Sequence, residues 1–121
     1  MALAKEIKYI KEPTDLQCGQ AVIAMLASRS VDEIIDITGT DRETDLKQMF
    51  HALEICDIKY NKARIPVESK EALPSIALLS LETPRCWHWS LYFKGKFYDP
   101  EHGVLDDFPK ANRKYYWEIT E

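Results

Sequence analysis

The spacing of hydrophobic residues changes about halfway along the chain. Between residues 17 and 54 the apolar positions recur at helical intervals, whereas after residue 75 they form short runs or alternate with polar residues. The first pattern is typical of α-helices and the second of β-strands. This order predicts an α+β fold, in which N-terminal helices pack on a C-terminal antiparallel sheet.

The segment from Gln17 to Ser28 is apolar on most of its circumference. A helix of this kind belongs at the centre of a domain, with other elements packed around it. The preceding Pro13 cannot continue a strand, and Thr14 and Asp15 are good N-cap residues. We therefore expect a central helix that begins shortly after Asp15.

Two more helices are predicted by capping-box signatures, in which a serine or threonine is followed three residues later by a glutamate. Ser30 and Glu33 begin one helix, which Gly39 ends. Thr40 and Glu43 begin the next, which reaches about residue 54. That helix has an apolar stripe at helical spacing, formed by Leu46, Met49, Phe50 and Leu53.

The remaining segments favour strands. Residues 5–10 give a weak strand pattern, and residues 58–60 and 63–67 fit short strands or loops. Residues 75–81 predict a buried central strand, 87–93 and 96–99 a hairpin around Lys94-Gly95, and 115–119 a last strand. A hairpin with this turn pairs Tyr92 with Phe97 and brings His88, Ser90 and Asp99 to one side of the sheet. His88 is then the diagonal neighbour of Asp99, about 7–8 Å away at the backbone.

Composition and charge narrow the class of protein. The chain has 121 residues, 45% of them hydrophobic and 30% charged, which predicts one globular domain over residues 1–121. The net charge of −4 and the scattered lysines and arginines argue against nucleic acid as a partner. No apolar run is long enough for a membrane span. Three cysteines without a signal peptide favour free thiols and a cytoplasmic location; the oligomeric state is not predicted.

Cys18 is the candidate nucleophile. In the first turn of its helix it meets the positive end of the helix dipole, which favours the thiolate, and an imidazolium from His88 would favour it further. Asp99 can hold the imidazole in one tautomer. Gly19 keeps the approach to the sulfur open, and nearby backbone N–H groups can donate to an oxyanion. A thiolate, a base and an orienting carboxylate are the parts of nucleophilic catalysis, and Trp87 or Trp89 is a candidate wall of a substrate groove.

A zinc site is the alternative for the same region. Cys86, His88, Asp99 and His102 are all metal-ligand types. Their spacing matches no standard closed site, so we expect neither a metal nor a cofactor.

Three short motifs also resemble a known family. Gln17-Cys18-Gly19-Gln20-Ala21, His88-Trp89-Ser90-Leu91 and Tyr98-Asp99-Pro100 with Gly103 beyond are similar to the motifs of C39-like cysteine peptidases, which belong to the papain-like superfamily. The resemblance extends over about residues 9–107. It implies a papain-like fold, Cys18 as nucleophile, His88 as general base, Asp99 as its orienting partner, and a peptide or protein amide as substrate.

One position departs from the family pattern. Six residues before the cysteine the family usually has a glutamine whose amide donates to the oxyanion, and here the residue is Glu12. Three interpretations remain open: Glu12 is protonated, Gln17 supplies the donor, or the protein is a slow or degenerate member. The sequence therefore predicts a cysteine peptidase-like hydrolase, with two alternatives: an impaired papain-like module that binds a protein partner, or a deamidase or acyltransferase that uses the same three residues.

Overall fold

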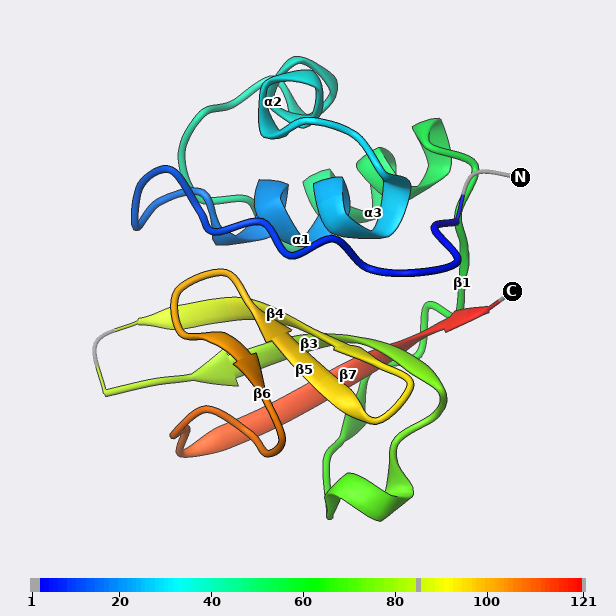
Figure 1. Ribbon diagram of the computed structural model, residues 1–121, viewed down its shortest axis with the longest axis vertical. Coiled ribbons are helices and arrows are strands. Elements are labelled where there is room, and N and C mark those ends of the chain that lie inside the picture. Colours follow the sequence, from blue (N-terminus) through cyan, green and yellow to red (C-terminus); the bar gives the residue numbers. More distant parts are fainter. Residues whose placement is uncertain (1–2, 85, 121) are drawn as a thin grey trace.

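The structure, a computed structural model, describes residues 3–84 and 86–120. A layer of helices lies on one face of an antiparallel sheet (Figure 1). The helices are α1 (Cys18–Ala27), α2 (Val31–Thr38) and α3 (Leu46–Ile55), with a short 3-10 helix, η1 (Lys70–Ala72), among the strands. The strands are β1 (Lys59–Tyr60), β2 (Ile65–Pro66), β3 (Ile76–Glu82), β4 (Trp87–Phe93), β5 (Lys96–Asp99), β6 (Gly103–Leu105) and β7 (Arg113–Thr120). The predicted α+β class and the order of helices and sheet are therefore confirmed.

The central helix is where the sequence predicts it. Every residue of α1 is buried, between α2 and α3 on one side and β4 on the other. Gly19 is the point of closest approach, because a Cβ atom there would lie 2.0 Å from the Thr44 hydroxyl oxygen. Gly19 therefore allows the start of α1 to pack against the segment that leads into α3. From the sequence, Gly19 was expected only to keep the approach to the sulfur open.

Two of the expected helix caps are wrong. The N-cap residue of α1 is Gln17, whose side chain makes no capping bond, whereas the hydroxyl of Thr14 accepts from a backbone N–H two residues on. The capping box of α2 at Ser30 is confirmed, and Gly39 ends that helix in the left-handed conformation.

The expected box at Thr40 and Glu43 is replaced by one at Asp45 and Gln48, so α3 begins later than predicted. Asp45 and Gln48 exchange hydrogen bonds of 2.8 and 2.9 Å between side chain and backbone. The Thr40 hydroxyl instead accepts from the backbone N–H of Arg42 in a turn. Two local hydrogen-bond patterns compete here, and the reciprocal one defines the helix start.

Strand β3 lies between β7 and β4, which confirms the central strand predicted at residues 75–81. The hairpin of β4 and β5 has the predicted bounds and the predicted pairing of Tyr92 with Phe97. Lys94 and Gly95 both adopt positive φ, as a tight two-residue hairpin turn requires. The last strand, β7, is longer than expected, and β6 was not expected.

The strand expected at residues 5–10 is wrong, because no strand is assigned to this segment. Its polar groups bond to the turn after β5 instead. The Tyr9 hydroxyl donates to the Asp99 carbonyl, and the backbone N–H of Glu12 donates to the Pro100 carbonyl at 2.9 Å. The N-terminal segment is thereby held across the end of β5.

None of the helices in the described part of the chain has the length and hydrophobicity that a membrane span requires.

Candidate active site

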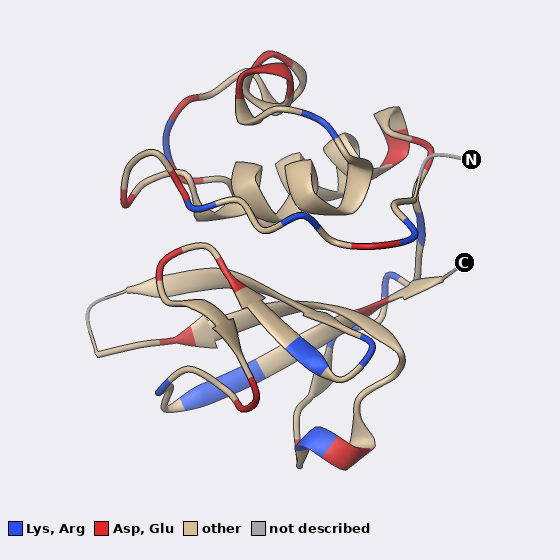
Figure 2. Ribbon diagram, viewed as in Figure 1, with Lys and Arg blue, Asp and Glu red and all other residues tan. Residues whose placement is uncertain are grey.

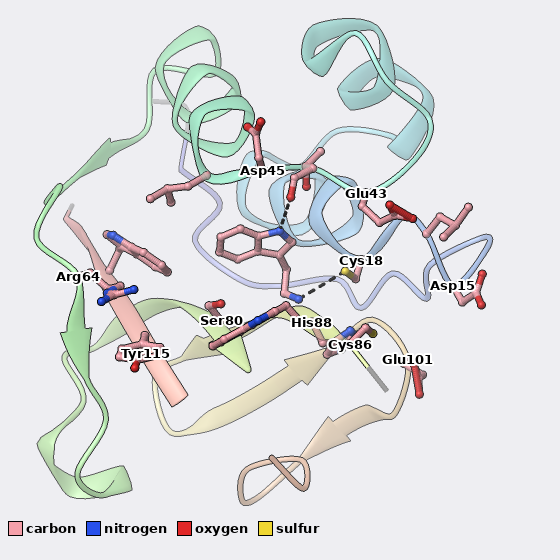
Figure 3. Close-up of a pocket in the computed structure, with 16 residues that line it drawn as sticks. Asp15, Cys18, Glu43, Asp45, Arg64, Ser80, Cys86, His88, Glu101 and Tyr115 are labelled. Atoms are coloured by element: carbon pink, nitrogen blue, oxygen red, sulfur yellow. Dashed lines mark hydrogen bonds between the residues drawn. The ribbon is translucent and has the colours of Figure 1, made fainter. Parts of the chain in front are cut away.

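The start of α1 meets the first half of β4, and this contact brings Cys18 to the sheet. The backbone N–H of Trp89 donates to the Cys18 sulfur at 3.4 Å (Figure 3). Cys18 is 7% exposed and lines a groove that opens between the helices and the sheet. Two segments 71 residues apart in the sequence therefore meet at the thiol, as the motif analysis predicts.

His88 and Asp99 form the buried pair that the hairpin register predicts. The Nε2 atom of His88 lies 3.0 Å from each carboxylate oxygen of Asp99. The hydroxyl of Ser90, on the same side of the sheet, donates to Asp99 at 2.8 Å. The backbone N–H groups of Glu101 and His102 also donate to Asp99, each at 3.0 Å. The carboxylate is thus completely surrounded by donors, with 0% of the residue exposed.

These contacts set the charge state of the pair. Burial alone would raise the pKa of Asp99, but hydrogen bonds from His88, Ser90 and the His102 backbone outweigh it and lower that pKa. Burial also disfavours the charged form of His88, but its hydrogen bonds to Asp99 and Cys18 outweigh burial and raise the pKa of His88. The arrangement favours an ionised Asp99 and an imidazolium at His88 beside the thiol.

Glu12 lies next to this pair but in an opposite environment. Only 6% of the residue is exposed, and neither carboxyl oxygen has a hydrogen-bond partner among the described residues. Burial, opposed by the charge of His88 and assisted by those of Glu101 and Asp99, raises the pKa of Glu12. The neutral form of Glu12 is therefore favoured more than in an ordinary glutamate, which agrees with the first of the three interpretations of this residue.

The second interpretation finds no support in the position of Gln17. The side-chain N–H of Gln17 donates to the Asp41 carbonyl at 3.0 Å, and the residue is 9% exposed. Neither Gln17 nor Glu12 is among the residues that line the groove. Gln17 thus fastens the start of α1 to the loop before α3 and has no donor directed at a bound molecule.

Metal-ligand side chains do converge beside the thiol, although not as the set considered from the sequence. One donor atom each from Glu12, His88 and Glu101 lies within 4.8 Å of the others, and within the described residues this is the group with such spacing. Carboxylate and imidazole are ligand types that zinc accepts. The considered set of Cys86, His88, Asp99 and His102 is not gathered in this way, because Asp99 is enclosed by His88, Ser90 and backbone donors.

The groove itself has a volume of about 700 Å³, within the usual range of ligand sites. Cys18, His88, Trp87 and Trp89 all line it. That either tryptophan contacts a substrate stays a prediction. No sequence pattern indicates that residues such as Thr44, Arg64 and Tyr115 also line it. Thr44 and Arg64 lie in loops and Tyr115 lies in β7, all outside both motifs, and only the tertiary fold brings them together.

Comparison with models of known protein families finds no match, and comparison with curated proteins likewise finds none. The function is therefore inferred from the geometry of these side chains and from the motif resemblance.

Proposed function

We propose that this protein is a cysteine hydrolase of papain-like, C39-like type, which cleaves a peptide or protein amide bond through Cys18, His88 and Asp99. The observation that carries the proposal is the position of His88, which bonds Asp99 through Nε2 at 3.0 Å and lines, together with Cys18, the same open groove. The order along the chain and the motifs around each residue add to it.

In this mechanism the Cys18 thiolate attacks the carbonyl carbon, and the carbonyl π electrons move to oxygen. When the carbon–nitrogen bond breaks, the amine takes its proton from the His88 imidazolium and an acyl-Cys18 thioester remains. His88, now neutral, removes a proton from water, and the resulting hydroxide attacks the thioester. The carboxylic acid product leaves, and the thiolate and imidazolium are restored. Asp99 keeps the ring oriented throughout.

Stabilisation of the oxyanion depends on backbone donors and on the charge of Glu12. Cys18 is the first residue of α1, where backbone N–H groups have no acceptor within the helix. An ionised Glu12 nearby would repel the developing negative charge, whereas a neutral Glu12 would not. Its raised pKa is therefore compatible with turnover. Transfer of the acyl group to another acceptor, or attack on a side-chain amide, would use the same three residues.

A second candidate function is a papain-like module that binds a protein partner and has lost turnover. The specific observation in its favour is the combination of Glu12, without a hydrogen-bond partner among the described residues, and Gln17, whose amide is engaged by Asp41. Neither residue offers the side-chain amide donor that the family uses.

The test is the reactivity of Cys18 toward iodoacetamide near pH 6, read peptide by peptide with mass spectrometry. An ordinary thiol is almost entirely protonated at this pH and reacts slowly. Exposed Cys86 serves as the internal comparison, and Cys18→Ala confirms the assignment of the labelled peptide. We expect Cys18 to react at least about tenfold faster than Cys86, because a neighbouring cationic histidine increases the reactivity of a thiol.

The His88→Ala variant is the control for the origin of that reactivity. It should slow the alkylation of Cys18 while the alkylation of Cys86 stays unchanged. If Cys18 of the wild type reacts no faster than Cys86, the activated nucleophile is contradicted and the binding module becomes the better conclusion.

A further inference from the structure

The groove beside Cys18 has a gradient of charge. Of the described residues that line it, Asp15, Glu43, Asp45 and Glu101 are acidic and Arg64 is basic. Figure 3 shows Asp15, Glu43 and Glu101 on the side of Cys18, while Arg64 lies across the groove. The two ends therefore present opposite charges to a bound molecule.

Two of these carboxylates are available to a ligand. Asp15 and Glu43 are exposed, and no hydrogen bond or ion pair joins their carboxylates to any residue that the structure describes. Asp45 differs, because its carboxylate accepts from the backbone of Gln48 and caps α3. The negative charge on the Cys18 side is thus carried by Asp15 and Glu43, neither of which forms an ion pair with a described residue.

Among the described residues that line the groove, the basic side chain, Arg64, lies away from these carboxylates. Figure 2 shows lysines and arginines along β5 and β7, and also in the loops of the helical layer, where they lie next to acidic residues. Arg64, the basic residue that lines the groove, lies over the ring of Tyr115 at 4.4 Å and is thereby held at the far end.

The half of the groove away from Asp15 is aromatic. Trp87 is 49% exposed, and its ring lies 6.1 Å from that of Tyr115 between centroids. The Trp89 ring lies 5.8 Å from that of Trp117, and its Nε1–H donates to the Thr44 carbonyl at 2.9 Å. The exposed aromatic surface of Trp87 favours a planar apolar side chain, and the hydrogen bond of Trp89 holds the second ring in place.

We propose that the groove binds a peptide segment with a lysine or arginine beside Asp15 and Glu43, and an aromatic residue against Trp87 and Tyr115. Opposite charges attract the basic side chain, and the same carboxylates repel an acidic one. This inference rests on the proposed hydrolase activity in one respect: the basic residue is adjacent to the carbonyl that Cys18 attacks. Binding of the segment does not depend on turnover.

The experiment measures peptide binding to the Cys18→Ala variant by titration calorimetry. The probes are acetylated, amidated peptides in which lysine and phenylalanine are separated by two alanines, in both orders. Matched peptides carry glutamate for lysine or alanine for phenylalanine. At an ionic strength of about 0.01 M, we expect the lysine peptide to bind at least about fivefold more tightly than the glutamate peptide. That ratio should approach one near 0.5 M salt, where the Debye length is only a few ångströms.

Variants then locate the two halves of the site. Asp15→Asn combined with Glu43→Gln should abolish the discrimination between lysine and glutamate. Glu68→Gln is the matched control, because it removes an exposed carboxylate that does not line the groove and should leave the ratio unchanged. Trp87→Ala should weaken the phenylalanine peptide but not its alanine counterpart.

Equal affinity for the lysine and glutamate peptides, or no binding of either, would overturn the proposal. Selective binding together with an unreactive Cys18 would support the groove and contradict the hydrolase. A reactive Cys18 without peptide selectivity would do the reverse. The two proposals therefore fail separately.

Discussion

Two buried carboxyl groups lie beside His88, and the fold treats them in opposite ways. Asp99, at the end of β5, accepts hydrogen bonds from His88, Ser90 and two backbone N–H groups. Glu12, in the N-terminal segment, is buried to a similar degree and has no partner for either oxygen among the described residues. Donors lower the pKa of the first despite its burial, and burial raises the pKa of the second.

The difference shows that the number of donors, more than depth, decides what a buried carboxyl group can do. An ionised Asp99 can orient His88 and stabilise an imidazolium. A neutral Glu12 can remain near the thiol without repelling an oxyanion. The backbone hydrogen bond from Glu12 to Pro100 holds the N-terminal segment to the end of β5, so both carboxyl groups lie in the same region of the molecule.

The largest effect should come from removal of Asp99. In Asp99→Ala, the buried side chain of His88 loses its partner and the donors of Ser90 and two backbone groups lose their acceptor. Breaking a buried pair from one side costs about 3 kcal/mol or more. We expect a loss of that size in the free energy of unfolding, measured by urea denaturation near pH 7.

Asp106→Ala is the matched control for this loss. Asp106 also pairs with a cation, Lys96, at 2.7 Å, but its side chain is 85% exposed. Water screens such an exposed pair, so we expect only a small loss of stability in this variant. A comparable loss in both variants would contradict the claim that the surroundings of Asp99 give it special weight.

Replacement of Glu12 should change stability in the opposite direction. Glu12→Gln keeps the shape of the side chain and removes the ionisable group, which is costly to bury without a partner. We expect a gain of about 1–2 kcal/mol in the free energy of unfolding near pH 7. Hydrolysis of an activated ester should also increase, by up to about 10²-fold, if the amide donates to the oxyanion.

The two readouts separate the candidate functions. Greater stability without any hydrolysis in Glu12→Gln would favour the binding module. A loss of stability would mean that the carboxyl group has a partner after all, and would remove the contrast with Asp99.

The pH dependence of that gain tests its cause. Because the pKa of Glu12 is raised in the folded protein, protonated Glu12 contributes stability that is fully present below the ordinary value of 4.5 and is lost as pH rises through the raised value. The advantage of Glu12→Gln over wild type should therefore grow from about pH 4.5 upward and then level off. A pH-independent advantage, measured in parallel urea titrations, would show that packing and not charge is responsible.

Sequence patterns predict the parts of this site that depend on local structure, and they do not predict contacts between distant segments. The hairpin register follows from a two-residue turn and strict alternation, so the sequence predicts the common side of His88, Ser90 and Asp99. The contact of Cys18 with β4 joins segments with no local signal between them, and only the motif resemblance anticipates it. The expected strand at residues 5–10 fails because its polar groups bond across the end of β5, a tertiary arrangement that alternation cannot reveal. The burial of Glu12 was hidden for the same reason.

The smallest effect concerns one donor of the many that Asp99 receives. Ser90→Ala removes the hydroxyl that donates at 2.8 Å, while His88 and both backbone groups stay in place. Because this is one of several hydrogen bonds to Asp99, the free energy of unfolding should fall by less than in Asp99→Ala. The pKa of Asp99 should rise toward its ordinary value, measured by NMR titration of its carboxyl carbon, because one of its lowering contacts is lost. If the pKa does not move, the remaining donors alone keep Asp99 ionised, and the contrast with Glu12 then depends on His88 and the backbone.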